Sequence, residues 1–95
     1  MKQYKTFEDL VFKPHPRLHS GLQATLEFDN GYGASVLIGD LFYSDGASTY
    51  EIACMKDGSC AYPKGSSFED DVLGYRGPEE ITELLKEIQD LPKVD

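Results

Sequence analysis

The sequence predicts an α+β domain in which an antiparallel β-meander of about four to five strands packs against one C-terminal α-helix. Two hairpin patterns and one amphipathic stretch lead to this prediction. The hairpins lie within residues 22–75, the amphipathic stretch covers residues 78–91, and residues 1–20 form an N-terminal arm. Because a chain of 95 residues buries only a small core, we expect residues 1–95 to form a single domain.

The first hairpin is predicted from the alternation of apolar and polar residues on both sides of the segment Asp29-Asn30-Gly31. A two-residue loop would put the apolar rows of the two strands on opposite faces of the sheet. A three-residue loop puts both rows on one face, and the buried face decides the register. Gly31 would then adopt the left-handed conformation that a type I turn with a G1 bulge requires.

Gly33 lies within the second strand of this hairpin. A glycine inside a strand often marks a bulge or the close approach of another group to the backbone. We expect the neighbouring group to be an aromatic side chain of the same protein, and the backbone of a partner is the alternative. Residues 30–33 are also a candidate small-molecule site, with a plain chain reversal as the simpler interpretation.

The second hairpin is predicted over residues 50–61, because Asp57-Gly58 is typical of a two-residue type I′ turn. In that register Cys54 and Cys60 point to opposite faces of the sheet. They then cannot form a disulfide within one chain, and we expect two free thiols. Cys54 is expected to be a buried apolar side chain rather than a nucleophile, because no histidine is close to it in the sequence.

The helix is predicted over residues 78–91. Pro78 suits the first helical position, and Pro92 ends the helix. The apolar residues recur at intervals of three and four, which places them in one stripe that must pack on the sheet. These residues are Ile81, Leu84, Leu85, Ile88 and Leu91.

Two loops are predicted within the sheet. Residues 39–49, GDLFYSDGAST, form a glycine- and serine-rich surface loop. In this loop Leu41, Phe42 and Tyr43 are candidate partner-binding residues, and the alternative is that they fold back over the edge of the sheet. Residues 63–71, PKGSSFEDD, form a second loop, after which DVLGY adds a short strand.

The net charge of -8 is unevenly distributed, since residues 1–20 carry four basic and two acidic side chains and the remainder carries five basic and fifteen acidic ones. An acidic surface repels phosphate, so direct DNA or RNA binding is not expected. The outer face of the predicted helix, where Glu83 and Glu87 should face solvent, is strongly acidic. Its carboxylates either solvate the helix or imitate phosphate groups and occupy the basic groove of a nucleic-acid-binding protein. These candidate partner-binding residues are Glu79, Glu80, Glu83, Glu87 and Asp90.

The sequence contains no catalytic, metal-binding or cofactor-binding pattern, so we expect neither an enzyme nor a cofactor. Two cysteines and two histidines, His15 and His19, do not match the spacing of zinc ligands. Arg76, which precedes the helix, is expected to pair with a nearby carboxylate rather than with a bound anion. The candidate carboxylates are Asp70, Asp71 and Glu79.

The expected location is the cytoplasm. No segment approaches the roughly 20 apolar residues of a membrane span. Residues 1–20 also lack the apolar run and the small-residue cleavage site of a signal peptide.

Several segments together resemble a group of small, uncharacterised proteins encoded by tailed phages and prophages. They are FDNGYGASV at 28–36, the hairpin YEIACMKDGSCAY, DDVLGY at 70–75 and the helix PEEITELLKEIQDL. The resemblance covers residues 22–91, whereas the 40–48 loop departs from the glycine-rich loop usual in that group. It implies a small accessory protein that binds a host or phage protein, with inhibition of a host defence or nucleic-acid-processing machine as one use. The alternative is a homo-oligomeric structural or assembly protein.

Overall fold

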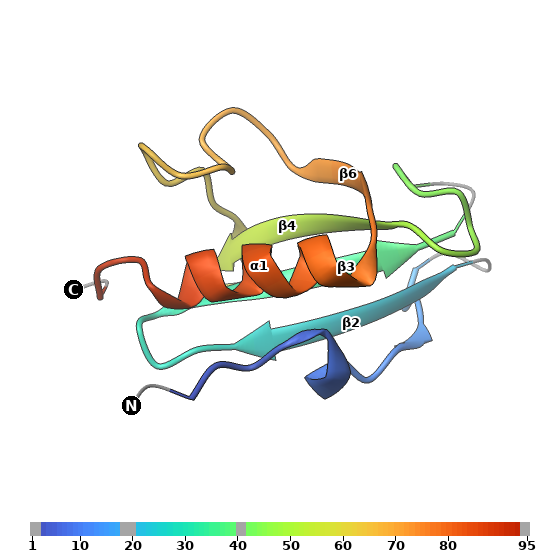
Figure 1. The fold of residues 1–95 in the computed structure, drawn as a ribbon, viewed down its shortest axis with the longest axis horizontal. Coiled ribbons are helices and arrows are strands. Elements are labelled where there is room, and N and C mark those ends of the chain that lie inside the picture. The colour runs from blue at the N-terminus through green and yellow to red at the C-terminus, as the bar shows by residue number, and fades with distance from the viewer. Residues whose placement is uncertain (1–2, 18–20, 40–41, 94–95) are drawn as a thin grey trace.

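The computed structural model describes residues 3–17, 21–39 and 42–93 and has the predicted α+β architecture, with one helix packed on an antiparallel sheet (Figure 1). The elements in chain order are the 3-10 helix η1 (Phe7–Asp9), β1 (Lys13–Pro14), β2 (Leu22–Glu27), β3 (Tyr32–Ile38), β4 (Tyr50–Lys56), β5 (Ser59–Cys60), β6 (Leu73–Arg76) and α1 (Pro78–Gln89).

The sheet has the strand order β1-β2-β3-β4-β5, and all of its pairings are antiparallel. β6 returns to the edge already used by β5, since both strands pair with β4. Among the described residues the sheet thus contains six strands, where about four to five were predicted. The additional strand is β1, which belongs to the N-terminal arm and pairs with the start of β2.

The first hairpin has the predicted register and a three-residue loop. The N–H group of Phe28 donates to the carbonyl of Tyr32 at 2.8 Å, which closes the loop. Gly31 has a φ of 91°, the left-handed conformation that the G1 bulge requires. The apolar rows therefore share one face, and their paired positions are Leu22 with Ile38, Ala24 with Val36 and Leu26 with Ala34.

The second hairpin also has its predicted turn. Asp57 and Gly58 have φ values of 53° and 80°, as a type I′ turn requires. Met55 pairs with Cys60 in this register. Cys60 therefore shares the face of Met55, and Cys54 points to the opposite face as predicted. Cys54 is buried and Cys60 is exposed, and both are free thiols.

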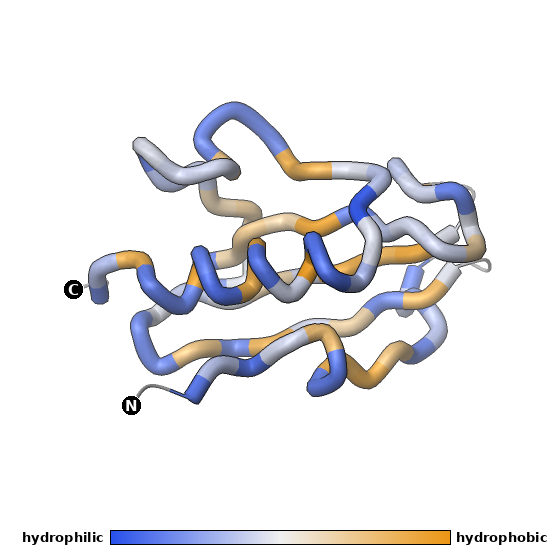
Figure 2. The backbone as a smooth tube through the Cα atoms, in the orientation of Figure 1, coloured by the Kyte–Doolittle hydropathy of each residue, from blue (hydrophilic) through white to orange (hydrophobic). Residues whose placement is uncertain are grey.

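The helix packs its apolar stripe on β3 and β4 (Figures 1 and 2). Pro78 occupies its first turn as predicted, but α1 ends at Gln89, two residues before the predicted end. Leu91 still packs against the core from outside the helix. The buried residues of the stripe are Ile81, Leu84, Leu85 and Ile88.

Two segments that the sequence assigned to a loop and an arm complete the core. Phe68, from the loop between β5 and β6, is only 1% exposed and joins the core cluster. From the arm, Phe7 and Phe12 pack against the ring of Tyr50, with ring centroids 5.1 and 5.5 Å from it. The thin core of a short chain is thus extended by aromatic residues from the N-terminal arm and from the loop between β5 and β6.

Gly33 corrects one expectation. A Cβ atom at this position would lie 2.5 Å from the carbonyl oxygen of Leu26. The group that approaches its backbone is therefore the neighbouring strand of the same chain, neither an aromatic side chain nor a partner.

Candidate functional site

The turn between β2 and β3 caps the C-terminal end of α1 through the side chain of Asn30. The side-chain amide of Asn30 donates to the carbonyl oxygens of Ile88 at 2.8 Å and Leu91 at 3.1 Å. Its oxygen accepts from the N–H group of Tyr32 at 3.1 Å. The last carbonyls of a helix have no partner within the helix, so Asn30 supplies donors that α1 needs.

This arrangement bears on the candidate small-molecule site at residues 30–33. A hollow of about 570 Å³ adjoins the turn, between β2 and the end of α1. The donors and the acceptor of the Asn30 side chain are all engaged within the protein. The turn therefore has a structural role that accounts for its sequence.

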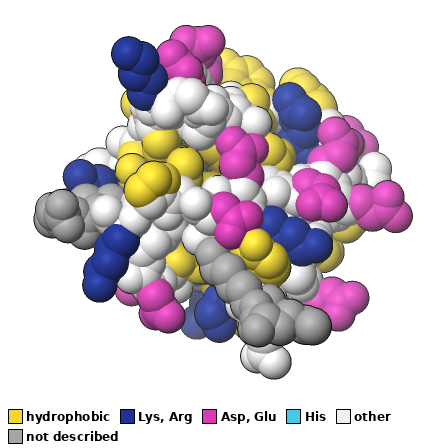
Figure 3. All heavy atoms as spheres, turned by 60° about the vertical axis from the view of Figure 1, so that its left-hand side comes forward, with side chains coloured by type: hydrophobic (Ala, Val, Ile, Leu, Met, Phe, Trp, Pro, Cys, Tyr) yellow, Lys and Arg dark blue, Asp and Glu magenta, His cyan; other side chains and the backbone are white. Residues whose placement is uncertain are grey.

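The acidic face of α1 divides into free and engaged carboxylates. Glu79 and Glu83 are exposed and have no hydrogen bond or ion pair with any other described residue. Figure 3 shows Asp and Glu side chains gathered over the middle and right of one face, with Lys and Arg side chains among them. Glu79 and Glu83 thus give α1 exposed negative charge that no other described residue engages.

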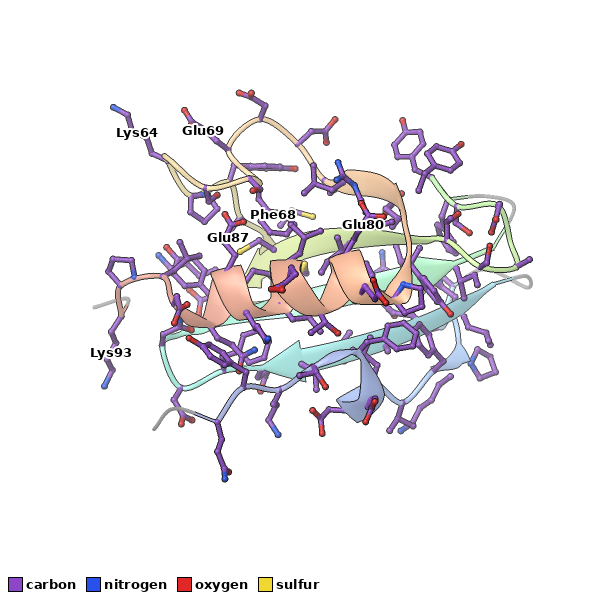
Figure 4. All side chains as sticks on the ribbon, in the orientation of Figure 1. Lys64, Phe68, Glu69, Glu80, Glu87 and Lys93 are labelled. Atoms are coloured by element: carbon purple, nitrogen blue, oxygen red, sulfur yellow. The ribbon has the colours of Figure 1, made fainter. Side chains whose placement is uncertain are left out.

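Glu87 corrects a second expectation, because it does not simply face solvent. Its carboxylate accepts hydrogen bonds from the backbone N–H group of Ser67 at 2.6 Å and from the Ser67 hydroxyl at 2.7 Å. In Figure 4, Glu87 lies on the side of α1 that faces the loop carrying Phe68. Glu87 therefore fastens this loop to the helix, and so holds Phe68 in the core.

Glu80 is also engaged. It accepts from the N–H group of Gly77 at 3.3 Å, and its other oxygen lies 3.6 Å from the guanidinium of Arg76. The predicted partners of Arg76 were Asp70, Asp71 and Glu79, so this ion pair is a correction. An i,i+4 spacing brings Glu80, rather than its neighbour Glu79, next to Arg76.

Asp90, at the end of α1, accepts a hydrogen bond from the hydroxyl of Tyr4 at 2.8 Å. The arm is also held by Gln89, whose amide group exchanges two hydrogen bonds with the backbone of Lys5. Farther along, the N–H group of Phe7 donates to the hydroxyl of Thr82 at 3.1 Å. The arm thus covers one side of the helix, and it engages Asp90, one of the predicted partner-binding carboxylates.

An open hollow of about 640 Å³ lies beside the first half of α1. The two free carboxylates belong to its wall, with Leu84 as an apolar member. Such a hollow fits a cationic side chain better than an anion, because carboxylates outnumber the one guanidinium. Its lining residues are Arg76, Glu79, Glu80, Thr82, Glu83 and Leu84.

The second group of candidate contact residues lies in the loop between β3 and β4. Leu41 is outside the described residues. Phe42 is half-buried, with its ring close to Gly21 and Gly39, so it folds back on the sheet. Tyr43 is exposed. The two neighbouring candidates therefore differ in exposure. Of Phe42 and Tyr43, only Tyr43 is available to a partner.

The same loop contains a rigid turn centred on Asp45. Three consecutive backbone N–H groups donate to its carboxylate at 2.7 to 2.9 Å, and they hold the pKa of Asp45 well below its usual value. The donors are Ala47, Ser48 and Thr49. This turn orders the loop that carries Tyr43.

The Cys54 thiol is buried in the core. Burial raises the pKa of the Cys54 thiol to about 11, which disfavours the reactive thiolate. Within residues 3–17, 21–39 and 42–93 no three His, Cys, Asp or Glu side chains are grouped as a metal site would require. In the same part of the chain, neither helix has the length and apolar character of a membrane span.

Comparison with known proteins gives no match to any family model, curated protein or solved structure. The function is therefore inferred from the residues of the chain itself.

Proposed function

We propose that this chain is a small accessory protein of the phage type, which docks on a basic surface of a host or phage protein through the acidic hollow beside the first half of α1. A host defence or nucleic-acid-processing machine is the class of target that such a surface suits, because these proteins present basic grooves to phosphate groups. Inhibition would follow from occupying the groove.

The observation that carries the proposal is the pair of exposed, unengaged carboxylates of Glu79 and Glu83 beside this hollow. In contrast, Glu87 and Glu80 have roles within the protein, as an anchor for a loop and as an ion-pair and capping partner. Carboxylates with no structural role remain free to contact a partner.

The net charge of -8 supports the same interpretation. Opposite charges on two surfaces accelerate the association of the two proteins, so an acidic surface favours basic partners over acidic ones. Salt screens this attraction beyond a Debye length of about 8–10 Å, so a docking surface of this kind must be sensitive to ionic strength.

The test begins with capture of the partner on the immobilised protein, followed by surface plasmon resonance with the purified partner. For the double variant Glu79→Gln, Glu83→Gln we expect association about tenfold slower in low salt, with a smaller effect on dissociation. In high salt the two proteins should associate at similar rates, because the charges are screened. Thermal unfolding should be nearly unchanged.

A matched control has the same change in net charge far from the hollow. Glu27→Gln with Asp57→Asn removes two exposed carboxylates, one from the end of β2 beside Gln89 and Leu91 and one from the turn between β4 and β5, neither of which lines the hollow. Asn suits the type I′ turn as well as Asp does. This variant should bind with nearly wild-type kinetics. Binding that is independent of salt and tolerates the first double variant would contradict the proposal.

The homo-oligomer alternative is distinguished by light scattering. A monomeric mass at the concentrations used for binding is expected if the acidic hollow serves a different protein. A stable dimer that the Glu79→Gln, Glu83→Gln variant dissociates would instead assign the hollow to a second copy of the chain.

A further inference from the structure

Two exposed tyrosines lie side by side at the edge of the sheet. Tyr43 is 57% exposed and Tyr75 is 61% exposed. Their ring centroids are 6.5 Å apart, and the ring planes are inclined by 47°. Exposed aromatic rings that are fixed in place are typical of residues that contribute strongly to protein–protein binding.

The backbone of Tyr75 is unusual. It has a φ of 55°, a conformation in which a bulky residue is strained. The other described non-glycine residue with positive φ is Asp57, where a type I′ turn requires it. Backbone strain without such a local reason tends to occur at functional positions.

This conformation turns the ring of Tyr75 outward. In a regular strand Tyr75 would lie on the same face as Leu73, which packs against the core. The pairing of β6 with β4 shifts its register between Tyr50 and Ile52 instead. The ring is therefore exposed because the strand is irregular at this point.

Backbone contacts hold the two tyrosines together. The N–H group of Tyr75 donates to the carbonyl of Tyr43 at 2.8 Å, and the N–H group of Tyr43 donates to the Glu51 carboxylate at 3.1 Å. Gly74 lies so close that a Cβ atom there would be 2.3 Å from the Cβ of Tyr43. The pair is thus organised before any partner binds.

We propose that the Tyr43–Tyr75 pair receives a lysine or arginine side chain of a protein partner. A cation within about 6 Å of an aromatic centroid is attracted to the ring face. The Glu51 carboxylate next to Tyr43 and the overall negative charge favour a cation further. Arg76 does not compete, because its guanidinium is bound to the Gly74 carbonyl and to Glu80.

This inference rests on the proposed function in one respect, the basic character of the partner. Its test uses short peptides and so does not need the partner. The ring resonances of the protein are followed by NMR during titration with acetyl-Gly-Arg-Gly-amide, at constant ionic strength. The matched probe contains citrulline, which has the shape of arginine without its charge.

We expect the ring signals of Tyr43 and Tyr75 to shift saturably as the arginine peptide is added. The citrulline peptide should bind at least about fivefold more weakly. Tyr75→Asn should abolish the shifts of Tyr43. It should leave the melting temperature equal or higher, because Asn tolerates a positive φ. Tyr62→Leu, which removes a different exposed tyrosine, is the control and should leave the titration unchanged.

Equal shifts with both peptides would overturn the inference, and so would a preference for a proline-rich peptide, which also docks on aromatic surfaces. A large loss of stability in Tyr75→Asn would show that the ring is structural and would likewise refute it. If the captured partner depends on Glu79 and Glu83 but tolerates Tyr75→Asn, the proposed function stands and this inference fails.

Discussion

The side chain of Asn30 offers the sharpest test of how the hairpin and the helix depend on each other. Its amide makes three hydrogen bonds, one to the Ile88 carbonyl in the last turn of α1, one to the Leu91 carbonyl just beyond the helix, and one from the N–H group of Tyr32. A hydrogen bond contributes roughly 0.5–1.5 kcal/mol net, and the site is half-buried, so water replaces part of what is lost. We therefore expect Asn30→Ala to lower the free energy of unfolding by about 2 kcal/mol.

Asn30→Asp should cost more than Asn30→Ala at neutral pH. The carboxylate cannot donate to the carbonyls of Ile88 and Leu91, and it adds negative charge at the negative end of the helix dipole. These contacts raise the folded-state pKa of the new carboxyl above its unfolded value of about 3.9. The deficit relative to Asn30→Ala should therefore shrink as the pH falls through that raised pKa toward 4, since protonation restores a donor.

The assay is urea unfolding monitored by circular dichroism, with melting curves as a second measure. For a domain of this size a loss of about 2 kcal/mol corresponds to a decrease of about 8–16 °C in melting temperature. Asp29→Ala, at the exposed neighbouring position, is the control and should change stability by less than about 0.5 kcal/mol. An Asn30→Ala variant as stable as the wild type would refute the role assigned to this side chain.

Four further predictions concern stability and titration. Gly31→Val should destabilise the fold by ~1 kcal/mol or more in urea unfolding, because a β-branched residue is strained at its φ of 91°; unchanged stability would argue against the bulged turn. In the same assay Leu84→Ala should lower the free energy of unfolding by ~2–5 kcal/mol, because it opens a cavity under α1; a loss below about 1 kcal/mol would show that the surrounding side chains fill the space. In native protein Cys60 should react with a thiol reagent rapidly and Cys54 slowly, with two thiols titrated in denaturant; equal native rates would contradict the burial of Cys54. The Asp45 carboxyl should titrate in NMR with its pKa well below 3.8, so that its stabilising effect is present above that unfolded value and is lost as the pH falls through the folded pKa; a normal midpoint would show that the loop is open.

The sequence by itself determined the local elements of this protein. The register of the first hairpin followed from the need to bury both apolar rows on one face, and the DNG turn with Gly31 satisfied it. The second turn and the opposite faces of the two cysteines followed from the Asp57-Gly58 pair. Each of these features depends on residues close together in the chain, so periodicity and turn chemistry were enough to predict it.

The tertiary structure decided which polar side chains were free to act. Glu83 and Glu87 are four residues apart on one helix, yet of the two only Glu87 accepts hydrogen bonds from the loop that carries Phe68. The role of Asn30 could not be predicted either, because the carbonyls to which it donates lie about sixty positions away in the sequence. A pattern within one element shows which face is polar but not what approaches it.

The Tyr43–Tyr75 pair shows the same limit most clearly. In a regular strand Tyr75 would share the face of Leu73, whereas the irregular pairing of β6 with β4 leaves Tyr75 exposed. Tyr43 is brought beside it by a backbone hydrogen bond between residues that no motif connects. Local patterns set the strands, the turns and the helix, whereas contacts between distant segments decided which side chains are engaged and which remain available, because such contacts depend on how the elements pack and not on the period of any one of them.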